Sequence, residues 1–267
     1  MNLVIKPWES LYRQRRLIEL MVRRDLVGRY KGSMAGAVWT IVNPLALLLI
    51  YWFVFSVIFR VRFGPDGQPV NFLLYVVAGL LPWMAFSEAL VRSNTCIVEN
   101  PNLVKKVVFP LEVLPVNHSL VGSLHSLVGI MILIALAIGV RGTLPWTIVL
   151  LPLVALPQLL FTIGIGWFLA SLGVFLRDLS HVIGLILTFW MFSTPIVYPE
   201  NLVPPTLVTL LHLNPFTAIV SGYRSVLLEG ALPEWRAWLY LVGVSLLTFF
   251  LGYAWSTRTR KGFADVL

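Results

Sequence analysis

Six long runs of apolar residues limit the fold of this chain more than any other feature of its sequence. A helix needs about 20 mostly apolar residues to cross a lipid bilayer. The runs occupy residues 34–59, 70–91, 110–140, 145–176, 182–198 and 237–256. The sequence therefore predicts an all-α integral membrane protein with six transmembrane helices.

The domain organisation follows from these runs. We expect a single transmembrane domain over residues 1–267, with the six-span bundle at 34–256. Residues 1–31 precede the bundle, and residues 257–267 form a tail. The first 31 residues hold eight Lys and Arg and no apolar core, so we expect no cleavable signal peptide there.

The composition excludes an ordinary soluble domain. Hydrophobic residues make up 58% of the chain and charged residues 12%, whereas soluble domains average about 25% charged residues. A soluble protein of this size would have too little interior to bury so much apolar surface. The net charge of +8 does not indicate nucleic acid, because the basic residues flank the apolar runs. Cys96 is the single cysteine, which excludes an intrachain disulfide and a CxxC pair.

The distribution of basic residues predicts the orientation in the membrane. Six spans place both termini on the same side, and fifteen of the 20 Lys and Arg residues fall on that side. The other side holds Arg60, Arg62, Arg141, Arg224 and Arg236. Because cytoplasmic loops are enriched in Lys and Arg, we expect both termini in the cytoplasm.

The segment before the first span has the pattern of an amphipathic helix. At 100° per residue, one apolar stripe contains Leu17, Ile18, Met21 and Val22. Arg16, Glu19 and Arg23 lie opposite this stripe. Such a basic helix is expected to lie in the membrane interface. A simpler role, electrostatic attachment to anionic lipid, explains the same pattern.

Two loops are more elaborate than simple connections. In residues 99–115, Asn100 and Pro101 read as the N-cap and first residue of a short helix that must end before Pro110. With Lys105 and Lys106, this helix could dock a partner on the inner side. A solvated turn with two cytoplasmic lysines is the plainer interpretation.

The loop between spans five and six, residues 194–234, contains six prolines and two apolar pieces, 207–213 and 216–228. Asn214 and Pro215 read as the N-cap and first residue of the second piece. Each piece is too short to cross a bilayer. They are expected to be either re-entrant half-helices, supported by neighbouring protein, or interfacial helices on the outer leaflet.

No enzymatic centre is evident. The phosphate-binding GxxxxGK[ST] and the hydrolase GxSxG patterns are absent, so any ATP must be bound by another chain. His118 and His125 share a helix face and suit a proton relay, metal ligation or, most simply, hydrogen bonds within the bundle. Glu88 is an acid near the inner end of the second span. We predict no metal site.

Aromatic side chains within the spans suit a path for sugar rings, whose C–H faces are apolar. The pathway candidates are Tyr51, Phe55, Trp83, Phe86, Phe189 and Trp190. Contact with lipid or helix packing is the alternative for each of them. The near absence of charge within the spans fits a cargo that slides, and argues against a proton-coupled carrier.

Two motifs carry a family resemblance. The stretch RDLVGRYKGSMAGAVWTIVNPL places an RDL-x3-Y-x2-S-x2-G-x2-W-x4-P pattern on Arg24, Asp25, Leu26, Tyr30, Ser33, Gly36, Trp39 and Pro44. A later motif comprises Asn214, Pro215 and Phe216, followed by Tyr223 and Arg224. Both motifs, and the order of elements over nearly the whole chain, resemble the membrane permease subunits of ABC-2-type polysaccharide exporters.

The resemblance implies a non-enzymatic permease in a bacterial cytoplasmic (inner) membrane. It would pair with a second copy of itself and with two copies of a separate ABC ATPase, which would hold ATP and Mg. The implied ATPase-coupling residues are Arg23, Arg24, Asp25, Tyr30, Lys31, Asn100, Pro101, Lys105 and Lys106. The implied outer gate consists of Asn214, Pro215, Phe216, Tyr223 and Arg224.

The resemblance also implies a cargo class. The family exports O-antigen, capsule or teichoic-acid chains, often attached to a polyprenyl diphosphate lipid. Arg23, Arg24 and Arg29 near the inner interface are candidates to meet that diphosphate, because guanidinium groups pair well with phosphate.

Three other functions are compatible with parts of the pattern. An exporter of a small lipid or drug from the same superfamily would commonly carry a large external domain, which this chain lacks. A membrane enzyme acting on polyprenyl-linked sugars would need acids or bases at the surface. The outer side offers Asp66, Glu200, Glu229 and Glu234, with no convergent pattern. A non-catalytic scaffold would not need the two structured loops.

Overall fold

The computed structural model describes residues 5–28, 38–58, 69–105 and 109–266, and the regular secondary structure of these residues is helical throughout, with no strand among them. The predicted all-α fold is thereby confirmed for these residues. Four helices are long and apolar enough to cross a membrane, by length and composition. They are α4 (Pro69–Thr95), α6 (Val113–Arg141), the continuous pair η3 (Trp146–Leu150) and α7 (Leu151–Phe175), and α11 (Trp235–Thr259).

Two of the predicted spans correspond to shorter helices. Helix α3 (Trp39–Trp52) and helix α8 (Leu179–Phe192) have 14 residues each, which is about 21 Å of α-helix. The chain continues from α3 into a π-helical segment, η2 (Phe53–Ile58), so helical backbone runs on to Ile58. Helix α8 ends before Pro195, six residues short of the predicted boundary at Tyr198, because the residue before a proline disfavours helix.

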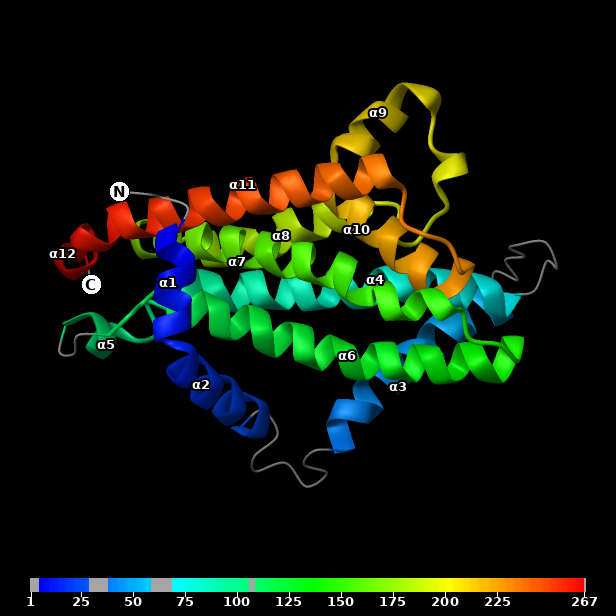
Figure 1. The fold of residues 1–267 in the computed structure, drawn as a ribbon, viewed down its shortest axis with the longest axis horizontal. Helices are drawn as coiled ribbons and strands as arrows, with labels where there is room; N and C mark the ends of the chain where they lie inside the picture. Colours follow the sequence, from blue (N-terminus) through cyan, green and yellow to red (C-terminus); the bar gives the residue numbers. More distant parts are fainter. Residues whose placement is uncertain (1–4, 29–37, 59–68, 106–108, 267) are drawn as a thin grey trace.

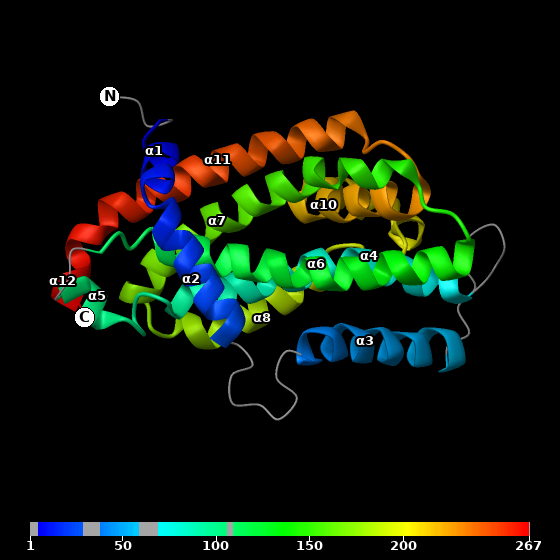
Figure 2. The same cartoon turned by 60° about the horizontal axis from the view of Figure 1, so that its bottom comes forward.

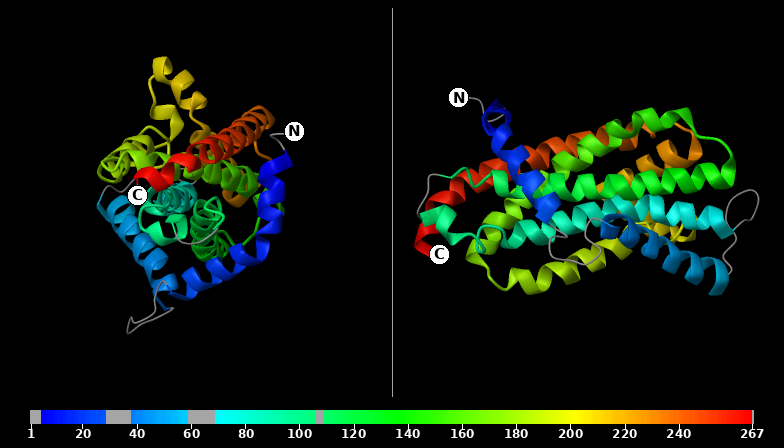
Figure 3. Two further views of the ribbon diagram at one scale, coloured as in Figure 1. Left: turned by 90° about the vertical axis from the view of Figure 1, so that its left-hand side faces the viewer. Right: turned by 90° about the horizontal axis from the view of Figure 1, so that it is seen from below.

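The long helices lie side by side along the longest axis of the molecule, and the described part of the chain begins and ends at one end of this bundle (Figure 1). Helices α1 (Ile5–Arg13) and α2 (Arg15–Gly28) cross the outside of the bundle near that end (Figure 3). The short helices α5 (Pro101–Lys105) and α12 (Phe263–Val266) lie at the same end, which we call the terminal end. Helix α3 runs beside α6 (Figure 2).

The opposite end, which we call the distal end, holds the segment between α8 and α11. The first helical element of this segment is η4 (Glu200–Leu202). Helix α9 (Pro205–Leu213) follows it and stands away from the bundle (Figure 1). Helix α10 (Pro215–Arg224) packs among α4, α7 and α11 and continues as the π-helical η5 (Ser225–Glu229). The two apolar pieces predicted here are therefore helices with different environments: one protrudes and the other is buried.

Helix α2 has the predicted amphipathic pattern, but its apolar face packs on protein. Ile18 and Met21 are buried in the cluster that also contains Val113 and Leu114 of the α6 region. Arg16, Glu19 and Arg23 are exposed. The apolar stripe therefore fixes α2 to the terminal end of the bundle.

Helices α7 and α11 approach each other so closely that glycine is required where they touch. A Cβ atom added at Gly252 would lie 2.1 Å from the carbonyl oxygen of Gly164. A Cβ atom at Gly164 would lie 2.4 Å from the backbone of Thr248. Small residues at such a contact let two backbones pack closely, which is a main source of helix association in membranes.

This contact generates a prediction about stability. Gly252→Ala should lower the free energy of unfolding by about 2 kcal/mol, because overpacking a closed site typically costs about 1–3 kcal/mol. The measurement is the thermal midpoint of the purified protein in detergent. Gly243→Ala in the same helix is the matched control, since nothing lies within 4 Å of a Cβ atom there. Equal midpoints for the two variants would contradict the prediction.

Candidate functional site

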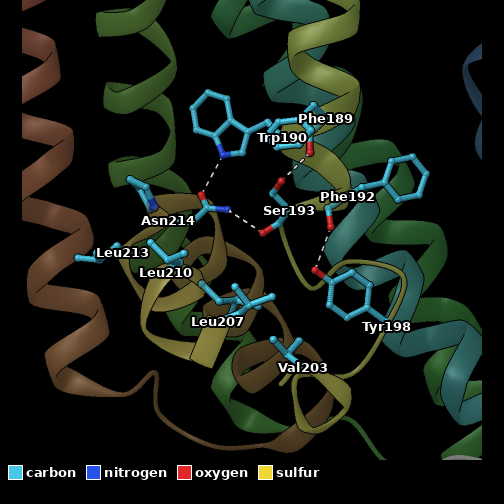
Figure 4. A pocket seen from close by; sticks show the side chains of 12 residues that line it. Phe189, Trp190, Phe192, Ser193, Tyr198, Val203, Leu207, Leu210, Leu213 and Asn214 are labelled. Atoms are coloured by element: carbon cyan, nitrogen blue, oxygen red, sulfur yellow. Dashed lines mark hydrogen bonds between the residues drawn. The ribbon is translucent and has the colours of Figure 1, made fainter. Parts of the chain in front are cut away.

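A mostly apolar cavity of about 620 Å³ opens at the distal end between the end of α8, α9 and the start of α10. Figure 4 shows the side chains around it. Its apolar wall includes Phe189, Phe192, Leu207, Leu210 and Leu213. Trp190, Ser193, Tyr198 and Asn214 add polar atoms to the lining. A cavity with apolar walls and a few placed polar groups is the usual form of a site for an organic ligand.

Asn214 joins the helices around this cavity. Its side-chain oxygen accepts hydrogen bonds from the backbone N–H of Phe216 at 3.0 Å and from Trp190 Nε1 at 2.9 Å. Its side-chain nitrogen donates to Thr194 Oγ1 at 2.8 Å. Asn214 is thus the N-cap of α10, with Pro215 in the first turn, as the sequence predicts. It also ties α10 to α8, which the sequence does not reveal.

A cluster of aromatic rings underlies Asn214 and contains residues from α4, α7, α8 and α10. Trp83 meets Phe216 edge to face with ring centroids 4.8 Å apart, and Phe86 lies 4.9 Å from Phe216. Phe86 also contacts Trp190 at 5.3 Å and stacks on Phe161 at 5.6 Å. Such contacts stabilise beyond the area they bury, so the start of α10 is firmly seated on the bundle.

Arg224 fixes the other end of α10. Its side chain is 4% exposed, and it donates to three backbone carbonyls: Tyr75 at 3.0 Å, Pro195 at 2.7 Å and Ile196 at 2.8 Å. Its guanidinium also lies 3.4 Å from the centre of the Tyr75 ring. Gly79 of α4 makes room, because a Cβ atom there would lie 3.1 Å from Arg224 Nη2. One side chain thus joins α4, α10 and the turn after α8.

Helix α9 is held at its C-terminal end. Tyr240 of α11 donates to the carbonyl of Leu213 at 2.5 Å. His212 forms a close contact with Glu200 of η4. Tyr198 donates to the carbonyl of Phe192 at 2.9 Å. The protruding segment therefore has a defined position over the cavity.

At the terminal end, Asp25 anchors α2 to α6. Its carboxylate accepts from Asn117 Nδ2 at 2.6 Å and from Arg24 Nε at 2.9 Å. In α5, Pro101 and Lys105 are exposed. The amide of Asn100 donates to the carbonyl of Cys96 at 2.9 Å and so closes the turn that leads from α4 into α5.

Comparison with known proteins decides the family. Residues 16–228 match the model of the ABC-2 type transporter membrane family, which is most of the chain. The chain belongs to the ABC-2 type transporter family.

Relatives with known names cover the chain from end to end. An O-antigen export system permease protein RfbA of Myxococcus xanthus is 31% identical over 98% of this chain and 99% of its own length. A protein of the same name from Klebsiella pneumoniae is 31% identical over 94% of this chain and 95% of its own. A polysialic acid transport protein KpsM of Escherichia coli is 28% identical over 93% and 95%. The relatives are permease subunits of polysaccharide exporters.

The structure brings the five predicted outer-gate residues of this ABC-2 protein together. Asn214 and Pro215 open α10, Phe216 and Tyr223 are buried along it, and Arg224 closes it.

The coupling candidates are more scattered. Arg23, Arg24 and Asp25 lie on α2, whereas Asn100, Pro101 and Lys105 lie at α5. Tyr30, Lys31, Lys106 and Arg29 lie outside the described residues. The roles of all these residues stay predictions.

The six aromatic pathway candidates have different surroundings. Trp83 and Phe86 are buried in the aromatic cluster, and Trp190 is half-buried at its edge. Phe189 is 76% exposed. Tyr51 and Phe55 stack on each other with centroids 5.8 Å apart, and Phe55 contacts Phe72 of α4. Within this one chain, only Phe189 and Trp190 line the distal cavity.

Glu88 and His125 line a second, smaller cavity of about 300 Å³ between α3, α4 and α6. Glu88 forms an ion pair with Arg92 at 3.0 Å, one helical turn away. His118 lies on the same helix as His125. The described residues contain no group of three or more His, Cys, Asp or Glu side chains placed to hold a metal ion.

Sequence reasoning missed two roles that a closer reading of the sequence would have suggested. An arginine inside an apolar segment, such as Arg224, needs several acceptors in order to be buried, and three backbone carbonyls provide them here. Asp25 interrupts the apolar stripe of α2, and its carboxylate meets Asn117 of α6. In both cases a charged residue that interrupts an apolar pattern makes a contact with residues distant in the sequence.

The contacts of Arg224 generate a second prediction. Arg224→Lys should lower the free energy of unfolding by about 2 kcal/mol, because one ammonium group cannot replace a planar fork that reaches three carbonyls. The thermal midpoint in detergent measures the effect. Arg236→Lys at the same end of the molecule is the control, since Arg236 is exposed. An Arg224→Lys protein as stable as the control would contradict the prediction.

Proposed function

We propose that this chain is the permease subunit of an ATP-driven exporter that moves a polysaccharide across the bacterial cytoplasmic membrane. The observation that supports this most is the end-to-end similarity to permeases named for O-antigen export. Polysialic acid and capsule exporters among the relatives have the same general cargo. We propose that the glycan is attached to a polyprenyl diphosphate lipid.

We propose that the chain crosses the membrane six times, with both termini in the cytoplasm. The four helices that are long and apolar enough to cross a membrane would supply four crossings. Helix α3 with η2 and helix α8 with the turn after it would supply the other two. The first and last described helices, α1 and α12, both lie at the terminal end, as an even number of crossings requires (Figure 1). The basic residues of α1, α2, α5 and the tail favour the cytoplasm for that end.

Membership of the ABC-2 family implies an ABC ATPase partner, and we propose that this partner binds the ATP and Mg. We propose two copies of that ATPase, docked at the terminal end through α2 and α5. The exposed residues Arg23, Pro101 and Lys105 face solvent there. Arg23, Arg24 and Arg29 are our candidates for binding the lipid diphosphate before transport.

We propose that two copies of this chain form the path between them. Helices α3 and α8 expose large apolar side chains, among them Trp52, Leu185 and Phe189. Phe189, Trp190, Tyr51 and Phe55 would face or border the path, while Trp83 and Phe86 would support α10 from within. Helix α10 is proposed as a re-entrant segment and α9 as an interfacial one, and together they would form the outer gate.

The proposed orientation generates a labelling prediction. In intact cells, a membrane-impermeant maleimide should label Asn201→Cys at the distal end and leave Asp265→Cys unlabelled until the membrane is permeabilised. Both positions are exposed. Cys96 is buried and is replaced by Ala as the background. Labelling of Asp265→Cys in intact cells would refute the orientation.

The proposed function is tested by export itself. In a strain that lacks this chain, surface glycan should return only when the chain and its ATPase are produced together. The chain should also bring the ATPase down on purification. The control is an ATPase variant that binds ATP and does not hydrolyse it. A purified chain that alone transforms polyprenyl-linked sugars would show that it is an enzyme instead.

A further inference from the structure

The segment that follows α11 makes specific contacts with the connection between α5 and α6. Arg260 is the first residue of η6 (Arg260–Gly262), directly after α11. Its Nη2 donates to the carbonyl of Phe109 at 2.6 Å. Its Nη1 lies 3.2 Å from Glu112 Oε2. The two terminal nitrogens of one guanidinium group therefore bind the connection at two positions, Phe109 and Glu112.

Glu112 extends this contact to two more helices. Its other carboxylate oxygen accepts from Ser10 Oγ of α1 at 2.9 Å. Its backbone carbonyl accepts from Trp167 Nε1 of α7 at 2.8 Å. Four parts of the chain that lie far apart in sequence thus meet at one residue. These are α1, the α5–α6 connection, α7 and the segment after α11.

The segment after α11 is itself fixed to the bundle. Phe263 is completely buried, with its ring 5.8 Å from that of Phe175 at the end of α7. Helix α12 packs against α5 as well as α7, and Figure 2 shows α12 beside α5 at the terminal end. The segment therefore gives Arg260 a firm base from which to hold the neighbouring connection.

We propose that Arg260, held by the segment after α11, is a positioning residue for energy coupling. This inference rests on the proposed function, in which the ATPase pushes on α5. Helix α5 has five residues and the chain beyond it needs a rigid link to α6 if a displacement is to reach the bundle. Arg260 supplies that link because it binds both Phe109 and Glu112. Glu112 is also bonded to α1, so the link extends to that helix.

Simple stabilisation of the fold does not account for the arrangement. The Arg260 and Glu112 side chains are 42% and 17% exposed, and a partly exposed ion pair contributes little to stability. The geometry is more specific than a charge contact, because a planar fork reaches a carboxylate and a carbonyl together. A lysine would have to reach both acceptors from one nitrogen and lacks the planar pair of nitrogens that fixes their relative position.

The first experiment measures position without using transport. Spin labels at Asn102→Cys in α5 and Asp265→Cys in α12, in a Cys96→Ala background, report the distance between the two elements in the assembled complex. Both sites are exposed. The distance distribution should be narrow for the parent protein and should broaden with Arg260→Gln. The matched control is Lys261→Gln, which removes the same charge one residue later and should leave the distribution narrow.

The second experiment measures coupling. Arg260→Gln and Arg260→Lys should assemble with the ATPase at the parent level. We expect surface glycan to fall by about tenfold for Arg260→Gln, the size typical of a lost coupling interaction, and less for Arg260→Lys. ATP hydrolysis should fall less than export does. The double variant Glu112→Arg with Arg260→Glu should recover at least part of the export lost in each single variant.

The outcomes separate the inference from the function on which it rests. A parent complex that exports no glycan would refute the proposed function, while the spin-label distances would still test the positioning role. Normal export and a narrow distribution for Arg260→Gln would overturn the inference. So would Arg260 variants that all fail to assemble, because Arg260 would then serve stability alone. No recovery in the double variant would show that the Glu112 pairing is not the cause.

Discussion

Three carbonyl groups around Arg224 illustrate the constraint that governs the rest of this structure. In an apolar surrounding, every backbone polar group must find a partner within the protein. The chain is not helical directly after α8, so the carbonyls of Pro195 and Ile196 lie outside the hydrogen-bond pattern of a helix. Arg224 donates hydrogen bonds to both carbonyls instead. Without that side chain, a non-helical turn and a half-length helix could not be buried against α4. The turn after α8 is thereby joined to α4 and α10.

Asn214 serves the same purpose at the opposite end of α10. The first N–H groups of a helix have no partner within it, and Pro215 removes one of them while Asn214 caps another. Its remaining polar atoms bond Trp190 and Thr194 of the α8 segment. Helix α10 is therefore held at both ends by side-chain hydrogen bonds, those of Asn214 at its start and those of Arg224 at its end. This rigidity suits the outer gate that we propose here, since a gate must have a defined closed position.

The sequence predicts the helices well and their contacts poorly. Apolar runs identify α4, α6, α7 and α11 because hydrophobic length is a local property. The α10 N-cap is also local, since Asn214 and Pro215 are adjacent to the helix they begin. The length of α8 was overestimated because an apolar stretch does not reveal where the backbone turns. The bond between Asp25 and Asn117, and the fork of Arg260, join residues distant in sequence. A pattern in one sequence can mark such a residue as an exception, but it does not identify the distant partner.

The predicted amphipathic helix shows how the same pattern can have two physical meanings. A stripe of Leu17, Ile18, Met21 and Val22 suits a lipid interface and a protein surface equally well. The structure packs Ile18 and Met21 against the bundle, and Asp25 would be an unfavourable residue in lipid but is a good partner for Asn117. The polar interruption, rather than the apolar stripe, distinguishes the two environments.

The exposed face of α8 has the chemistry that a path for a long hydroxylated polymer needs. Apolar exposure alone does not identify a partner in a membrane protein, because lipid is as apolar as the side chains it meets. The polar groups on this face are more informative. The hydroxyls of Thr188 and Ser193 donate to the carbonyls of Gly184 and Phe189 in their own helix. They therefore offer acceptor lone pairs and no free proton, beside the exposed ring of Phe189. In the proposed exporter, such a surface would touch sugar rings through many weak contacts and would have no fixed charge to trap them.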